Sequence, residues 1–234
     1  MSTATACPPG APRARRRASR GVALFDLDRT LLPGSSLMEL GRALADRRVI
    51  DRTTVARHAV KAAVFSRRGL PDARIERLSE SLLSAAADHD RDEIARVARE
   101  VGPEIAASAH PAARWLIERH RKAGDVCVVV SASPQELVEI IGDALGADRA
   151  VGTRTEVVDG RFTGRLDGPF CHGAGKLERL EAEMGRLDLR QASAYADSGS
   201  DLPLLQACGH PVAVNPDRRL REAAAEAGWP VLRF

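Results

Sequence analysis

The stretch VALFDLDRT, residues 22–30, determines the fold we expect and where its site lies. Residues 22–26 form a short apolar run that ends in an acid, which predicts a buried strand of a parallel sheet. Asp26 and Asp28 follow two positions apart as the chain leaves this strand, so both project to the same side. Ligands of open α/β sheets bind at the carboxyl ends of the strands, so we expect a site here.

The chain beyond residue 110 alternates between helical patterns and short apolar runs. Helices are expected over 111–122, 134–145 and 175–186, and strands over 125–131, 192–196, 212–214 and 231–233. Asp159-Gly160, between alternating segments, predicts a hairpin over 151–166. Alternating strands and helices predict an α/β fold with a doubly wound parallel sheet.

Residues 35–109 have a different character, because they are rich in Ala, Arg, Leu and Glu with apolar positions at helical spacing. They predict three or four helices, with breaks near 69–71 and 88–90 and an end at Gly102-Pro103 or His110-Pro111. This segment interrupts the sheet after its first strand. We therefore expect a helical cap, 35–109, inserted into a core made of 21–34 and 110–234.

Composition excludes several classes of function. Of the 234 residues, 44% are hydrophobic and 29% charged, the net charge is +3 and only 3% are aromatic, so neither nucleic acid nor an anionic membrane is expected as a partner. No apolar run approaches the ~20 residues of a membrane span. The four cysteines show no CxxC spacing, which favours the cytoplasm. The arginine-rich residues 1–20 predict a disordered basic tail rather than a targeting peptide.

The acid pair after the first strand suits phosphoryl transfer. Asp26 can attack phosphorus and form an acyl phosphate. Asp28 can protonate the leaving oxygen and then deprotonate the attacking water. The alternative for this motif is a turn with two solvated acids.

Three later segments carry groups that phosphoryl transfer also needs. Ser131 ends a predicted strand, where its hydroxyl and the following backbone N–H groups can cradle a phosphate; a helix cap by Ser131 or Ser133 is the alternative. Lys176 follows a glycine-rich loop and can neutralise phosphoryl oxygens, although a surface lysine is the alternative. Asp197 and Asp201 can complete an Mg²⁺ site with Asp26 and the backbone carbonyl of Asp28, or else cap a helix.

The ordered motifs FDLDRTLL (25–32), VVVSASP (128–134), GAGK (173–176) and YADSGSDLPLL (195–205) resemble those of the haloacid dehalogenase superfamily. The resemblance covers nearly all of 21–234 and is greatest to the phosphoserine-phosphatase-like branch. It implies a Rossmann-like core, a helical cap and an Mg²⁺-dependent phosphomonoesterase acting on a small phosphorylated metabolite. The site residues that it implies are Asp26 and Asp28 in catalysis, Ser131, Ala132 and Lys176 on phosphate, Asp26, Asp28 and Asp197 on the metal, and Asp201 and Thr30 in support.

The substrate stays open at this stage. Phosphoserine phosphatases carry a glutamate nine residues after the nucleophile, where it meets the substrate amine, and here that position is Ser35, followed by Ser36. A hydroxyl cannot pair with an ammonium as a carboxylate does, which disfavours phosphoserine. Ala196 and Ser198 replace glycines that are common in relatives. A phosphotransferase with the same site, and an inactive binding or regulatory protein, are the remaining alternatives, and the oligomeric state is open.

Several other residues have weaker signals. His172 can touch substrate from the loop before Lys176, and Arg29 can contact substrate or pair with a cap acid. The remaining expectations concern a flap edge at Arg154 and Glu156, a solvated cap face at Arg57, Arg67 and Arg68, and core packing of Trp115 and Trp229.

Overall fold

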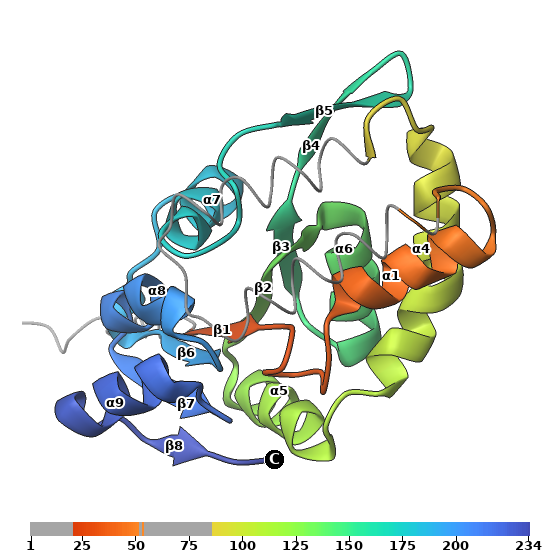
Figure 1. The fold of residues 1–234 in the computed structure, drawn as a ribbon. Helices are drawn as coiled ribbons and strands as arrows, with labels where there is room; N and C mark the ends of the chain where they lie inside the picture. Colours follow the sequence, from red (N-terminus) through yellow and green to blue (C-terminus); the bar gives the residue numbers. More distant parts are fainter. Residues whose placement is uncertain (1–20, 52, 54–85) are drawn as a thin grey trace, which may run out of the picture.

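Six parallel strands form the main sheet of the computed structural model, which describes residues 21–51, 53 and 86–234. Their order is β3-β2-β1-β6-β7-β8 (Figure 1). The strands are β1 (Val22–Asp26), β2 (Val126–Pro134), β3 (Arg149–Thr153), β6 (Ser193–Ala196), β7 (His210–Val214) and β8 (Val231–Leu232). Because β1 lies between β2 and β6, the residues that follow these three strands meet at one edge of the sheet.

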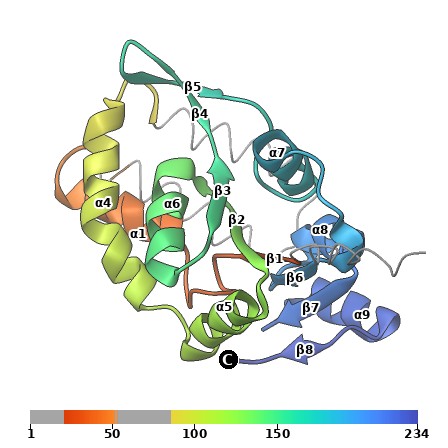
Figure 2. The same ribbon diagram turned by 180° about the vertical axis from the view of Figure 1, so that it is seen from behind.

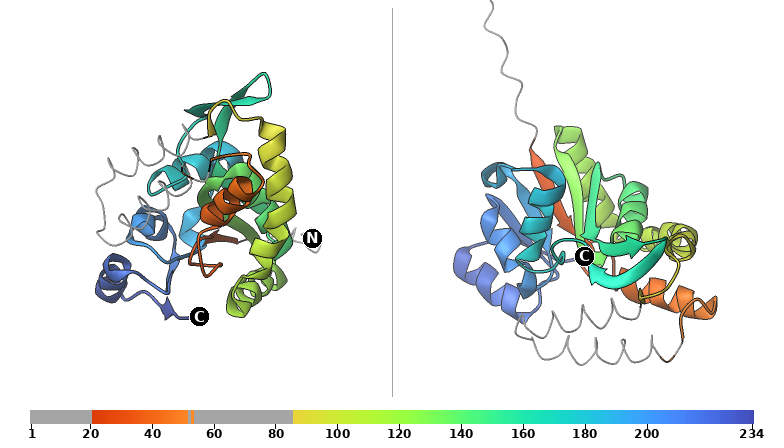
Figure 3. Two further views of the ribbon diagram at one scale, coloured as in Figure 1. Left: turned by 45° about the vertical axis from the view of Figure 1, so that its right-hand side comes forward. Right: turned by 90° about the horizontal axis from the view of Figure 1, so that it is seen from above.

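Helices cover both faces of this sheet, as the views from behind and from above show (Figures 2 and 3). The helices on one face are α5 (Pro111–Ala123) and α6 (Gln135–Leu145), and those on the other are α7 (Gly175–Met184), α8 (Leu202–Ala207) and α9 (Arg218–Ala227). Successive strand residues enter different cores: Phe25 packs with the first set of helices and Leu24 with the second. This arrangement confirms the predicted doubly wound α/β fold.

The predicted cap is described only at its two ends. Helices α1 (Ser36–Asp46) and α4 (Arg91–Ala107) pack against each other, and α4 runs along α6 (Figure 1). The expected break near 69–71 lies outside the described residues, so the division into cap and core stays a prediction.

Of the two boundaries expected at the end of this segment, Gly102-Pro103 is wrong. Helix α4 continues through Pro103, and the chain breaks instead at His110-Pro111, where α5 begins. Gly102 is buried against α6, and a Cβ there would lie 2.4 Å from Cγ2 of Ile140. The close packing that this glycine allows stabilises the helix across a proline that lacks an N–H donor.

The predicted hairpin forms in part. Strands β4 (Thr155–Val158) and β5 (Arg161–Leu166) pair antiparallel around Asp159 and Gly160, whose φ angles of 50° and 78° suit a two-residue hairpin turn. Residues 151–153, however, belong to β3 and pair parallel with β2, so the expected hairpin began too early. Two short 3₁₀ helices, η1 (Leu189–Gln191) and η2 (Gly199–Asp201), flank β6.

Of the two tryptophans expected in the core, Trp115 is on the surface. Trp115 lies on the outer side of α5 and is 57% exposed, and the Arg119 guanidinium carbon lies 5.4 Å from the centroid of its ring. The inward positions of α5 are Ala113, Leu116 and Ile117, which places Trp115 on the opposite side of the helix. Trp229 is partly buried and packs against the core beneath α7, α8 and α9.

The cysteines of the described chain are free, and their thiols are protected. Cys127, Cys171 and Cys208 are all buried, and burial raises the pKa of each thiol to about 12. Across residues 21–51, 53 and 86–234, no helix has both the length and the apolar character that spanning a bilayer requires.

Candidate active site

Strand register brings the sequence motifs to one edge of the sheet. Asp26 ends β1 and is paired with Val130, the residue before Ser131. Phe25 is paired with Tyr195 of β6, two residues before Asp197. The acid motif, the serine motif and the second acid motif are therefore adjacent because β1, β2 and β6 are neighbours.

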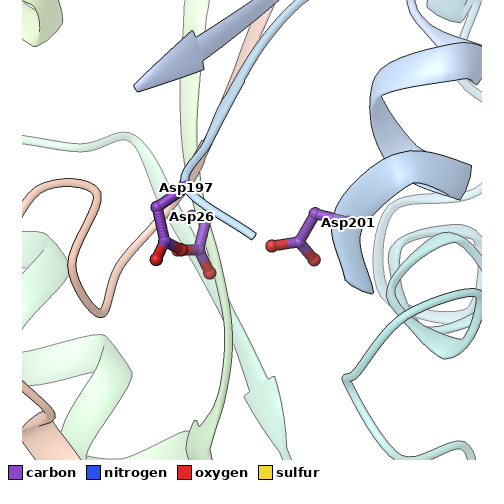
Figure 4. A group of neighbouring side chains, drawn as sticks. All are labelled: Asp26, Asp197 and Asp201. Carbon is purple, nitrogen blue, oxygen red and sulfur yellow. The ribbon is translucent and has the colours of Figure 1, made fainter. Parts of the chain in front are cut away.

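Three carboxylates form the centre of the site. Asp26, Asp197 and Asp201 each offer an oxygen within 4.8 Å of the others, and they are only 6%, 5% and 2% exposed. Figure 4 shows Asp26 and Asp197 side by side, with the Asp201 carboxylate directed toward them from the start of α8. The group can hold a divalent metal ion, and its all-oxygen donor set fits Mg²⁺.

Lys176, at the start of α7, binds two of these acids. Its Nζ lies 2.7 Å from Asp26 Oδ1 and 2.7 Å from Asp201 Oδ1, and the side chain is 2% exposed. Burial alone would lower the pKa of this amine, but the two carboxylates outweigh burial and raise the pKa. The surface-lysine alternative is therefore wrong, and Lys176 is a buried cation beside Asp26.

Burial and mutual repulsion shift the other acids. Burial, followed by the charge of Asp26, raises the pKa of Asp197 to about 7, against an opposing effect of Arg29. Burial raises the pKa of Asp201 to about 6, although the charge of Lys176 lowers it. The alternative in which Asp201 caps a helix is also wrong, because α8 has no side-chain cap hydrogen bond from it. Three crowded carboxylates are the surroundings that favour a bound cation.

Asp28 is held apart from this cluster by the start of α1. Its carboxylate accepts hydrogen bonds from Ser35 Oγ (3.2 Å), Ser36 N (2.9 Å) and Ser36 Oγ (2.6 Å). Burial raises the pKa of the Asp28 carboxyl, and the bonds from Ser36 oppose that rise. The two acids of the first motif thus have different partners, and the alternative of two solvated acids does not hold for buried Asp26.

The roles of Ser35 and Ser36 were not apparent from the sequence. Ser35 is the N-cap residue of α1 but makes no cap hydrogen bond, because its hydroxyl turns to Asp28. Ser36 Oγ also lies 2.8 Å from Ser133 Oγ, which connects α1 to the end of β2. The sequence signal that could have indicated these contacts is the pair of serines seven and eight residues after Asp28.

The predicted phosphate-binding residues lie at the same edge, within the end of β2, because this strand continues to Pro134 and does not end at residue 131 as expected. Ser131 is buried, and its Oγ accepts a hydrogen bond from Ser133 N at 3.2 Å. Helix α6 has Pro134 as its N-cap residue and no side-chain cap, so the capping alternative for Ser131 and Ser133 is wrong. The Ala132 carbonyl accepts a hydrogen bond from Thr153 Oγ1 at 2.8 Å, which joins the end of β2 to the end of β3. Phosphate binding by Ser131 and Ala132 stays a prediction.

Thr30 and Arg29 connect the first motif to the metal-site acids. Thr30 Oγ1 donates a hydrogen bond to Asp26 Oδ2 at 2.7 Å and lies 3.5 Å from Asp197 Oδ1. Arg29 Nε lies 3.3 Å from Asp197 Oδ2, so among the described residues this arginine pairs with an acid of the site. The alternative of a cap acid as its partner stays a prediction, because much of the cap lies outside those residues. Thr30 therefore lies beside both acids, and its supporting role in the reaction stays a prediction.

Asp217 supports the site, a role that was not predicted from the sequence. Its carboxylate accepts hydrogen bonds from Gly199 N (3.1 Å) and Ser198 Oγ (3.3 Å), and its own N–H donates to the Asp197 carbonyl at 2.8 Å. The same side chain caps α9 by accepting from Leu220 N. An acid before a helix is an N-cap signal, but that signal does not reveal the second contact.

The weaker candidates have ordinary partners. The His172 ring stacks on Phe170 with centroids 5.7 Å apart. Arg154 pairs with Glu183 at 2.6 Å, and Glu156 accepts a hydrogen bond from a threonine of β5. The arginines expected on a solvated cap face, at positions 57, 67 and 68, lie outside the described residues.

Comparison with known protein families identifies the family of this chain. The family model described as haloacid dehalogenase-like hydrolase matches residues 23–206, which include every motif of the site. The chain belongs to this family. The resemblance seen in the motifs is thereby confirmed.

Several curated relatives of this haloacid dehalogenase-like chain are named as phosphatases. It is 35% identical to a probable phosphatase of Mycobacterium tuberculosis, over 97% of this chain and 80% of that protein. It is 36% identical to a phosphoserine phosphatase of the same species, over 91% and 70% of the two chains. A histidinol-phosphatase of Neisseria meningitidis is 32% identical over 92% and 99%. The chain is accordingly an enzyme of phosphatase type.

Solved structures agree on the fold. A Bordetella pertussis protein of unknown function superposes with a TM-score of 0.79 at 34% identity, over 92% of this chain and 99% of that one. A substrate-bound phosphoserine phosphatase superposes with a TM-score of 0.66 at 21% identity, over 92% and 94%. The second likeness extends to the fold alone.

Proposed function

We propose that this enzyme is an Mg²⁺-dependent phosphomonoester hydrolase that works through a phospho-aspartyl intermediate on Asp26. The observation that carries the proposal is the setting of Asp26, a buried carboxylate that ends the central strand. It lies against Lys176 and within 4.8 Å of Asp197 and Asp201. A nucleophile, a buried cation and an oxygen-ligand metal site are the parts that phosphoryl transfer requires.

In the first step Asp26 attacks phosphorus and the bond to the alcohol oxygen breaks. Thr30 and Lys176 each hold one oxygen of Asp26, which restricts the rotation of the carboxylate. The charge of Lys176 also offsets the repulsion between the carboxylate and an incoming phosphate dianion. Asp28 gives its proton to the departing alcohol, a task that its raised pKa suits.

In the second step water hydrolyses the acyl phosphate, and Asp28 takes a proton from that water. Ser131, Ala132 and Lys176 would hold the phosphoryl oxygens through both steps. Asp26, Asp197 and the backbone carbonyl of Asp28 would hold Mg²⁺ with Asp201 beside them, and the ion would supply positive charge to the phosphoryl oxygens.

A small phosphorylated metabolite is the substrate class that we propose. Relatives named for phosphoserine and for histidinol phosphate support a small phosphomonoester. Ser35 disfavours phosphoserine itself, because a hydroxyl stands where phosphoserine phosphatases carry a carboxylate and here donates to Asp28. We also propose a cytoplasmic location, which the free buried cysteines support.

A phosphate-release screen of a metabolite library with Mg²⁺ tests this function. Asp26→Asn should show no turnover while it still folds and binds inorganic phosphate, because an amide is a poor nucleophile. Asp143→Asn, an exposed change on α6, is the matched control and should keep full activity. Turnover by Asp26→Asn at the rate of the unaltered enzyme would falsify the mechanism.

A further inference from the structure

Arg29 is the one member of the first motif whose charge the proposed mechanism does not use. Its side chain is 58% exposed, while that of its partner Asp197 is 7% exposed. The backbone at Arg29 has φ of 64°, a left-handed conformation that is uncommon for any residue with a side chain. Such strained positions cluster at functional sites, and this one brings the guanidinium to the rim of the carboxylate cluster.

The charges around the cluster do not cancel. When all three acids are ionised, Asp26, Asp197 and Asp201 supply three negative charges, while Lys176 and Arg29 supply two positive ones, which leaves one negative charge. The two cations also occupy different places. Lys176 is buried between Asp26 and Asp201, whereas Arg29 reaches Asp197 from solvent.

Arg29 therefore acts on the acid that a metal ion would also need. Its Nε lies 3.3 Å from Asp197 Oδ2, and the other oxygen, Oδ1, faces Thr30. A metal ion that binds Asp197 competes with the guanidinium for this carboxylate. Repulsion between the two cations adds to the competition, although solvent screens part of it because the guanidinium is exposed.

We propose that Arg29 makes metal binding depend on phosphate. With Arg29 present, a divalent ion changes the net charge of the cluster from minus one to plus one, and a phosphate dianion returns it to minus one. Without Arg29 the metal alone would make the cluster neutral, so the metal would bind more readily and the phosphate less so. Arg29 thus weakens binding of the metal alone and strengthens binding of the metal together with phosphate. The coupling is reciprocal: phosphate raises the affinity for the metal by the same factor as the metal raises the affinity for phosphate.

The inference rests on the proposed function, since it assigns a regulatory part to the same metal site. The inference also assigns the exposed guanidinium a role when metal and phosphate are both bound. Once the metal binds Asp197, the Arg29 guanidinium can instead contact a phosphate at the solvent-exposed side of the carboxylate cluster. Its long side chain can make that change without moving β1 or β6.

The test is a titration with Mn²⁺, followed by electron paramagnetic resonance, with and without inorganic phosphate. Arg29→Gln should bind Mn²⁺ alone about threefold to tenfold more tightly than the unaltered enzyme, the size of a modest coupling. Phosphate should tighten Mn²⁺ binding several-fold in the unaltered enzyme and much less in Arg29→Gln. Arg29→Lys, which keeps the charge, should retain most of the coupling.

Two further variants keep the test decisive. Arg42→Gln removes an exposed arginine that pairs with Glu39 on α1 and should leave both affinities unchanged. Arg29→Gly removes the guanidinium and relaxes the left-handed backbone, so it should reproduce Arg29→Gln even if glutamine perturbs folding.

Equal Mn²⁺ affinity and equal coupling in the unaltered enzyme and both neutral variants would overturn the inference. If Mg²⁺-dependent phosphate release is then still lost in Asp26→Asn, the proposed function stands without it. Failure of the unaltered enzyme to bind Mn²⁺ would overturn both.

Discussion

Two acids two residues apart are expected to behave differently because different side chains bind them. Asp26 has Thr30 and Lys176 on its two oxygens, whereas the Asp28 carboxylate accepts hydrogen bonds from Ser35 and Ser36 at the start of α1. A cation beside one acid and hydroxyls beside the other suit a nucleophile and a proton carrier respectively.

Removal of the buried cation should damage both stability and turnover. Lys176→Met leaves Asp26 and Asp201 without their partner, and breaking a buried pair in this way costs about 3–5 kcal/mol. We expect lower free energy of unfolding in urea and no detectable phosphate release. Lys122→Met, which removes an exposed lysine paired with Glu118, is the control and should change neither. Unfolding at the same urea concentration in both variants would contradict the buried pair.

The hydroxyl of Ser36 should matter most for poor leaving groups. Ser36→Ala removes the 2.6 Å bond to Asp28, so Asp28 should be less well oriented to protonate the alcohol. We expect kcat/KM to fall about tenfold for an alkyl phosphate, which is part of the roughly 10²–10⁴-fold that general acid catalysis contributes. For p-nitrophenyl phosphate, whose leaving group needs no proton, the fall should be small. An equal loss on both substrates would show that Ser36 acts through folding or binding instead.

The sequence predicted which side chains lie together where the chemistry required a residue type at a strand end or a helix start, and their catalytic roles stay predictions. Asp26, Lys176, Asp197 and Asp201 come together as expected. The partners of Asp28 were not predictable, because they depend on the direction in which α1 leaves the sheet. Local pattern likewise does not say whether an arginine such as Arg29 will face the cap or the site.

At the scale of elements, the start of α9 holds the loop that carries Asp197. Asp217 caps α9 and also binds the backbone of Gly199, so one side chain serves both purposes. Asp217→Ala should lower stability by about 1 kcal/mol, as for other N-caps, and should also weaken Mn²⁺ binding. Asp90→Ala, which removes the N-cap of α4, is the matched control and should cost stability alone. Equal Mn²⁺ affinities in the two variants would argue against a role of Asp217 in the metal loop.

Element boundaries failed where tertiary packing overrode local pattern. Residues 151–153 alternate like the start of a hairpin, yet they join β2 in the main sheet. The sequence around Gly102-Pro103 resembles a helix end, yet close packing of Gly102 on α6 carries α4 past it. Both outcomes depend on packing against an element from another part of the chain, and a local sequence pattern contains no information about that partner.

At the scale of the whole molecule, sheet order is what assembles the site. β1 is the first strand in the chain but lies inside the sheet, flanked by β2 and β6. The acids of 26 and 197 are thereby neighbours although 171 positions separate them in sequence. The alternation of strands and helices predicted this doubly wound class, and the order of the strands followed only from the structure.

The whole enzyme should be stabilised by Mg²⁺ more strongly at high pH. In the folded protein treated with chelator, the pKa values of Asp197 and Asp201 lie at about 7 and about 6, above the ordinary 3.8. The folded state then holds protons that the unfolded chain releases, so stability without Mg²⁺ should fall as pH rises from about 4 to about 7. Mg²⁺ binds the ionised acids, so its stabilising effect should grow over the same range.

The measurement is the melting temperature with and without Mg²⁺ at pH 5.5 and pH 8. We expect a larger increase on adding Mg²⁺ at pH 8, and Asp197→Asn should reduce that increase because it removes both a ligand and a titrating group. Arg42→Gln should behave as the unaltered enzyme does, since Arg42 pairs with Glu39 away from these acids. The same Mg²⁺-induced increase at both pH values would mean that these carboxylates are already ionised at pH 5.5. In that case burial and repulsion would be too weak to keep Asp197 and Asp201 protonated at pH 5.5. The site would then bind its cation with little competition from protons.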